Sequence, residues 1–119
     1  MAAMRRVVVT GMGIACPLGV GVEHVWQRLI GGESGISAIQ SFDTANLPAK
    51  IAGQVPAGTR ADGGLDLAEW VPVKDQKKMD RFIHLALVAA TEAVEDSGWT
   101  PEDEEARCAT GVMIGSGIG

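Results

Sequence analysis

The stretch RRVVVTGMG occupies residues 5–13, and VMIGSGIG occupies residues 112–119 at the other end of the chain. In both, a short apolar run stops at glycines. Continuous β-branched runs of this kind are typical of parallel strands that are buried on both faces. A glycine directly after such a strand lets the backbone approach another segment closely. The two stretches therefore predict an α/β protein with buried strands at Val7–Thr10 and Val112–Ile114.

Between these runs, the pattern predicts turns, short strands and a first helix. Residues 11–21 form a glycine-rich turn, and apolar residues then recur at helical spacing over Val22–Ile30 until Gly31 and Gly32 end the helix. Residues 34–44 belong to a long connection. Lys50–Val55 is predicted as a short edge strand, and Leu65–Trp70 as one helical turn.

A second, longer helix is predicted over Lys74–Ser97, with Gly98 following it. From Phe82 to Val94 it is apolar on nearly every face. Such a helix belongs inside a larger body, so we expect these residues to be part of a longer fold. Thr100 and Pro101 are predicted to cap and begin a further helix.

Composition limits the class of protein. The chain has 119 residues, 46% of them apolar, and a net charge of −5. One domain is the expectation at this length. The acidic balance argues against a nucleic-acid partner. Two cysteines without metal-site spacing indicate a reduced, cytoplasmic setting. No apolar run is long enough for a signal or a membrane span.

The obvious motifs for chemistry are incomplete. Gly11 and Gly13 begin a dinucleotide-binding pattern, but Cys16 stands where the third glycine belongs, and Pro17 after it has no N–H for a phosphate. Cys16 is a possible nucleophile in a turn, although a small half-buried turn residue is the preferred interpretation. His24 and His84 have no partner at metal or triad spacing and are interpreted as structural or exposed.

A cluster of basic residues is more informative. Lys74, Lys77, Lys78 and Arg81 stand at i, i+3, i+4 and i+7, which predicts one helix face. They form a local positive patch on an acidic chain. Spacing alone leaves two interpretations open: a solvated helix start, or a docking face for an acidic partner.

Taken together, the motifs resemble the N-terminal part of the β-ketoacyl-acyl-carrier-protein synthases, and most closely the synthase II type. The matching pieces occur in family order over essentially the whole chain. They are residues 5–13, Pro17-Leu18-Gly19, Trp26 with Leu29, Ser34-Gly35-Ile36, Phe42-Asp43, Ala52-Gly53, Met79-Asp80-Arg81-Phe82, Asp96-Ser97-Gly98 and residues 114–119.

The resemblance implies a thiolase-like fold, layered α-β-α-β-α, of which residues 1–119 are an incomplete part of the first half. It implies a homodimer that elongates fatty acids by decarboxylative condensation with malonyl-loaded acyl carrier protein. The family's catalytic Cys and two His are expected beyond Gly119, so no catalytic residue is expected in this chain. No cofactor and no metal are implied.

Two sites carry over by position. Lys74, Lys77 and Lys78 match the basic patch that the family uses against its carrier protein, and Ile118 matches the residue that gates the acyl pocket. Within the family, a ketosynthase subunit of a polyketide pathway is the alternative. A truncated chain that only binds carrier protein or a partner subunit is another. A nucleotide-binding oxidoreductase is a distant third.

Overall fold

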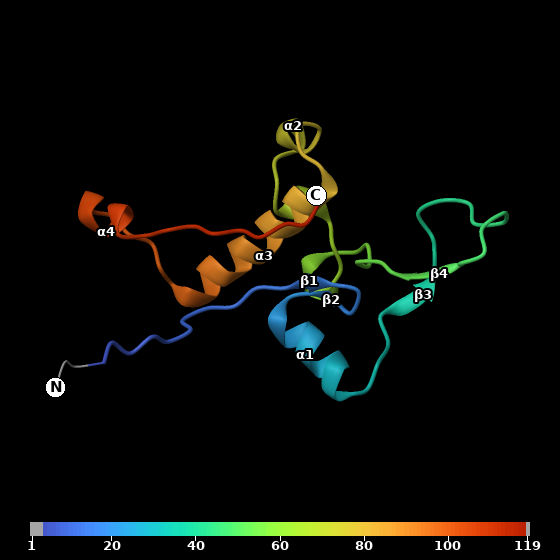
Figure 1. The fold of residues 1–119 in the computed structure, drawn as a ribbon, viewed down its shortest axis with the longest axis horizontal. Helices are drawn as coiled ribbons and strands as arrows, with labels where there is room; N and C mark the ends of the chain where they lie inside the picture. The colour runs from blue at the N-terminus through green and yellow to red at the C-terminus, as the bar shows by residue number, and fades with distance from the viewer. Residues whose placement is uncertain (1–3, 119) are drawn as a thin grey trace.

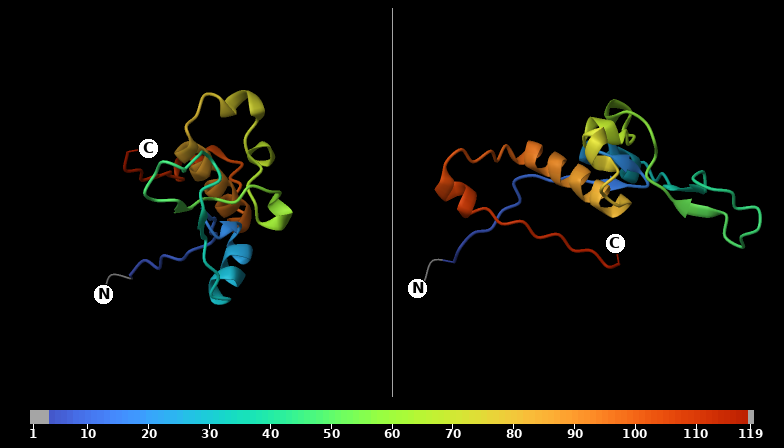
Figure 2. Two further views of the ribbon diagram at one scale, coloured as in Figure 1. Left: turned by 90° about the vertical axis from the view of Figure 1, so that its right-hand side faces the viewer. Right: turned by 90° about the horizontal axis from the view of Figure 1, so that it is seen from above.

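The structure, a computed structural model, describes residues 4–118 (Figure 1). Its elements are β1 (Ala15–Cys16), β2 (Gly19–Val20), α1 (Val22–Ile30), β3 (Ile36–Ala38), β4 (Ile51–Gly53), η1 (Arg60–Asp62), η2 (Leu67–Glu69), α2 (Val73–Gln76), α3 (Arg81–Ser97) and α4 (Glu104–Cys108). The radius of gyration is 17.7 Å, whereas a compact domain of this length has about 13.5 Å. The chain is therefore extended, as the views in Figure 2 show.

Two small antiparallel pairs make up the β-structure. β1 pairs with β2 across a turn at Pro17 and Leu18, and β3 pairs with β4 in the register Ser37 to Ala52. The edge strand expected over Lys50–Val55 is confirmed as the shorter β4. Its partner β3 lies in the stretch that the sequence assigned to a connection.

The β1–β2 pair packs closely against the β3–β4 pair at two glycines. A Cβ on Gly35 or on Gly53 would lie 2.7 Å from atoms of Pro17. Because real Cβ atoms do not come so close, both positions require glycine if the turn between β1 and β2 is to rest against β3 and β4.

A small core lies where β2, η2 and α3 meet. Its buried members are Val20, Leu65 and Val88, with Leu85 and Trp70 packed against them. The predicted helix at Val22–Ile30 is confirmed as α1, although only Val25 on its apolar face is buried.

The two predicted terminal strands are absent from the described residues. Val7–Thr10 and Val112–Ile114 are extended but exposed, and neither pairs with another strand within residues 4–118. A strand needs a hydrogen-bonded neighbour, and no described segment supplies one. The prediction of strands at both positions is wrong for this part of the chain.

The long helix predicted over Lys74–Ser97 is also wrong in part, because it is two helices. α2 ends at Gln76, and Asp80 takes an extended conformation with ψ of 164° before α3 begins. Asp80 is the N-cap of α3, where its backbone carbonyl accepts the His84 N–H while its side chain makes no capping hydrogen bond. Gly98 ends α3 in the left-handed region at φ 64°, as predicted.

Two further expectations concern the ends of this region. The short turn expected within Leu65–Trp70 is confirmed as η2. The N-cap of the last helix is Asp103, whose carboxylate accepts the Ala106 N–H, so the prediction that Thr100 caps this helix is wrong.

Within residues 4–118, no helix combines the length and the apolar character needed to cross a membrane.

Candidate functional site

The basic residues do not share one helix face as predicted. Lys74 lies in α2, Lys77 and Lys78 lie in the turn after it, and Arg81 begins α3. The break before Asp80 removes the continuous helix that the spacing assumed. All four cations are nevertheless exposed. We call residues 73–78 the basic segment.

One of these lysines is paired. Lys78 Nζ lies 2.9 Å from Asp75 Oδ1, with the lysine side chain 70% exposed. Such surface pairs contribute little to stability. Among the described residues, Lys74, Lys77 and Arg81 have no carboxylate within salt-bridge distance. Their charges are available to a partner.

Hydrogen bonds at Gln76 hold the basic segment against its surroundings. The Gln76 carbonyl oxygen lies 3.1 Å from His84 Nε2 on α3, and the Gln76 side-chain amide donates to the Val71 carbonyl at 2.9 Å. His84 is buried, which fits its interpretation as structural. The one sign of this contact in the sequence is that a single histidine stands within an otherwise apolar helix pattern.

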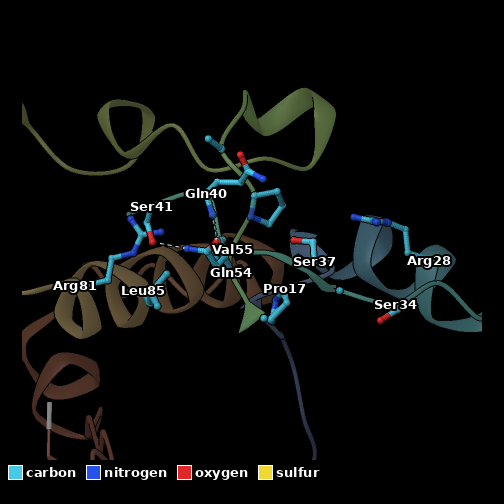
Figure 3. Close-up of a pocket in the computed structure, with 14 residues that line it drawn as sticks. Pro17, Arg28, Ser34, Ser37, Gln40, Ser41, Gln54, Val55, Arg81 and Leu85 are labelled. Carbon is cyan, nitrogen blue, oxygen red and sulfur yellow. Dashed lines mark hydrogen bonds between the residues drawn. The ribbon is translucent and has the colours of Figure 1, made fainter. Parts of the chain in front are cut away.

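An open cleft of about 920 Å³ adjoins Arg81. Arg81 and Arg28 lie at opposite ends of it in Figure 3. Among the residues that the structure describes, no Asp or Glu lines the cleft. Arg28 already pairs with Glu33 at 2.6 Å and donates to the Leu18 carbonyl. The unpaired Arg81 therefore extends the positive surface of the basic segment to the cleft.

Carboxylates on α3 hold the glycine-rich stretch of residues 11–21. Glu92 accepts the backbone N–H of Ile14 at 2.9 Å and that of Val22 at 2.7 Å. Asp96 accepts the Met12 N–H at 2.9 Å. These hydrogen bonds hold the backbone of the glycine-rich stretch and the start of α1 against α3. The stretch therefore has a structural role.

The two glycines of the dinucleotide-like pattern have a packing role here. A Cβ on Gly13 would lie 1.9 Å from the Ala89 carbonyl oxygen, and one on Gly11 would lie 2.3 Å from that of Ala93. Both glycines therefore let the chain pass directly over the backbone of α3.

The other candidate residues lie apart from the basic segment. Ile118 is fully exposed near the end of an extended stretch that follows α4 and turns back along the length of α3, separate from the helix (Figure 2). It lines neither cavity found in the described residues. Cys16 is half-buried in β1. His24 packs against Gly19 and Gly63, where a Cβ would meet its ring.

One charged contact was not foreseen. Arg60 forms a 2.6 Å ion pair with Glu95, and its guanidinium lies 4.3 Å from the centre of the Trp70 ring. The hydrogen bond that Arg60 donates to the Glu95 carboxylate raises the pKa of Arg60, and burial acts in the opposite direction. This contact joins η1 to α3 and has no sequence signature, because the partners stand 35 positions apart.

Comparison with known proteins places these features in a family. The model for the N-terminal domain of β-ketoacyl synthases matches residues 4–119. A "3-oxoacyl-[acyl-carrier-protein] synthase 2" of Rhizobium meliloti is 47% identical over 98% of this chain. A "Tetracenomycin polyketide synthase ketoacyl synthase beta subunit" of Streptomyces glaucescens is 38% identical over all of it. The chain spans about 28% and 27% of the lengths of these two proteins.

A solved structure agrees. "The ishigamide ketosynthase/chain length factor" superposes with a TM-score of 0.66 at 37% identity, covering 82% of this chain and 23% of that one. The α/β, thiolase-like fold class is thereby confirmed. On the family match and the relatives together, the chain belongs to the β-ketoacyl synthase family, and its residues 4–119 match the family's N-terminal domain.

Proposed function

We propose that the full-length protein is a condensing enzyme that elongates fatty acids on acyl carrier protein. The observation that carries this is the 47% identity, over nearly the whole chain, to a 3-oxoacyl-acyl-carrier-protein synthase 2. The chain covers only about a quarter of that relative's length, so the reaction is proposed for the whole protein.

In the proposed reaction, a cysteine thiolate first takes an acyl group from its carrier protein as a thioester. Malonyl-carrier protein then loses CO₂, and the electron pair of the broken C–C bond becomes a carbanion. This carbanion attacks the thioester carbonyl, and the cysteine leaves as thiolate. The step needs an activated thiolate and donors that stabilise the developing oxyanion. We assign these roles to a Cys and two His beyond Gly119.

The described residues are proposed to contribute docking. Lys74, Lys77 and Lys78 are exposed, and the first two are free of ion pairs among the described residues. A cationic surface on a chain of net charge −5 favours an acidic partner, because complementary charge orients the encounter and speeds it. We propose that acyl carrier protein, in its acyl- and malonyl-loaded forms, binds here.

Charge reversal tests this docking site. The variant Lys77→Glu/Lys78→Glu of the full-length enzyme is expected to bind carrier protein at least about tenfold more weakly at low salt, with a smaller loss at high salt. A matched control, Lys50→Glu/Arg107→Glu, changes the net charge equally at exposed cations outside the basic segment. Equal affinities for the two double variants at low salt would argue against the site.

A polyketide ketosynthase subunit is the second candidate. The 38% identity to the tetracenomycin subunit supports it, since that match covers the whole chain. The two candidates differ in product: a fatty-acid synthase yields a singly extended 3-oxoacyl chain whose keto group is reduced before the next extension, whereas a polyketide pathway retains keto groups. A truncated chain that only binds carrier protein or a partner subunit would give no product.

That the protein forms a homodimer and that it lies in the cytoplasm both remain predictions.

A further inference from the structure

His84 is the only buried polar side chain in the described part of the molecule, at 9% exposure. It lies in the first turn of α3, and the proposed docking role does not use it directly. A buried imidazole is retained at low cost only where its ring nitrogens find partners. Its partner identifies what this residue does.

That partner is a main-chain oxygen of the basic segment. His84 Nε2 lies 3.1 Å from the Gln76 carbonyl oxygen. A carbonyl oxygen can only accept, so the hydrogen bond requires that Nε2 carries the proton. Both the corresponding neutral tautomer and the imidazolium satisfy this requirement.

The basic segment depends on such contacts for its orientation. α2 has four residues, and a helix of one turn is not stable by itself in water. Within residues 4–118, His84 is the only side chain outside the segment that hydrogen-bonds to it. A second hydrogen bond leaves the segment: the Gln76 side-chain amide donates to the backbone carbonyl of the buried Val71. Gln76 is thus held on both sides.

The three lysines surround this anchored residue. Lys74 precedes Gln76 by two positions, while Lys77 and Lys78 follow it directly. Fixing the Gln76 carbonyl therefore fixes the backbone from which all three cations project. We propose that His84 is a positioning residue whose buried imidazole holds the basic segment in the conformation that binds an acidic carrier protein. This inference rests on the proposed function, which supplies the partner.

The test compares three variants of the full-length enzyme. His84→Phe keeps an aromatic ring but removes the donor, His84→Gln restores an N–H donor near the position of Nε2, and Lys77→Glu/Lys78→Glu removes the docking charges. The measurements are kcat and KM with malonyl-carrier protein, and with a malonyl-pantetheine thioester that lacks the protein. Loss of a hydrogen bond that orders a segment is expected to raise KM for malonyl-carrier protein about five- to tenfold in His84→Phe.

In the same variant, kcat and the KM for the pantetheine thioester are expected to stay unchanged, and His84→Gln is expected to behave like the unaltered enzyme. A purely structural role would instead change both substrates together. Adding His84→Phe to the lysine reversal is expected to cause no further loss, because both changes remove the same interaction. If His84→Phe does not fold, Gln76→Leu removes the second hydrogen bond and carries the same expectations.

Two results separate failure of the inference from failure of the docking site. If the lysine reversal raises the KM for malonyl-carrier protein but His84→Phe does not, or if His84→Phe affects both substrates equally, the positioning role is wrong and the docking site stands. If the lysine reversal leaves that KM unchanged, the docking site and the positioning role are both wrong.

Discussion

Glu92 Oε1 accepts the backbone N–H of Val22, the first residue of α1, at 2.7 Å. The N-cap of α1 is Gly21, which has no side chain to satisfy the free N–H groups of the helix. A carboxylate 70 positions further along the chain therefore takes the role of the cap. Its other oxygen accepts the Ile14 N–H, so one side chain joins α3 to both ends of the β1–β2 pair.

Removing this carboxylate is expected to loosen the N-terminal part of the molecule. Glu92→Ala leaves two partly buried N–H groups without an acceptor, at a cost of about 1–3 kcal/mol for each. Hydrogen exchange of the full-length protein is expected to speed up in peptides covering residues 12–25. Glu95→Ala is the matched control, because it removes a neighbouring carboxylate whose ion pair with Arg60 is half-exposed. Similar exchange in both variants would contradict the capping role of Glu92.

Glycine at position 13 is expected to be essential. A methyl group there would lie 1.9 Å from the Ala89 carbonyl oxygen, which belongs to the backbone of α3 and cannot rotate away. Gly13→Ala is therefore expected to lower the unfolding temperature of the full-length protein strongly or to prevent its accumulation in soluble form. Gly111→Ala serves as the control, since nothing lies within 4 Å of the added Cβ in the described residues. An unfolding temperature for Gly13→Ala equal to that of the control would show that the close packing is absent.

Ile118 is expected to govern acyl-chain length in the full-length enzyme. The resemblance predicts that it gates the acyl pocket, where a larger side chain would fill space that a long chain needs. Ile118→Phe is expected to shift the accepted primers to shorter chains, measured as relative kcat/KM over a series of acyl-carrier proteins. Ile118→Val keeps a small branched side chain and is expected to retain long primers. An unchanged preference in Ile118→Phe would remove this residue from the pocket.

The elements that the sequence predicted well are those decided by neighbours in the chain. α1 ends where expected because Gly31 and Gly32 follow its last apolar residue, and Gly98 ends α3 for the same reason. Strands depend on distant partners, so the apolar run at Val7–Thr10 could not reveal that no described segment pairs with it. The run predicts burial, and the structure leaves it exposed.

In the candidate site too, local features were predicted correctly and contacts between separate elements were not. Exposure of Lys74, Lys77 and Lys78 follows from their charge and was foreseen. Their shared helix face was not found, because the spacing fits a continuous helix equally well and Asp80 interrupts it. The contact between His84 and Gln76 joins residues eight positions apart across that interruption. No periodic pattern carries such information, although a lone histidine inside an apolar helix was the available sign.

The most direct test of this account is the condensation reaction of the full-length protein. Purified enzyme would be loaded with an acyl group from acyl carrier protein and then mixed with malonyl-carrier protein, with CO₂ release and the carrier-bound product measured together. The account predicts one CO₂ for each 3-oxoacyl chain extended by two carbons. Binding of carrier protein without CO₂ release or extended product would contradict the proposed enzyme and leave only a binding protein.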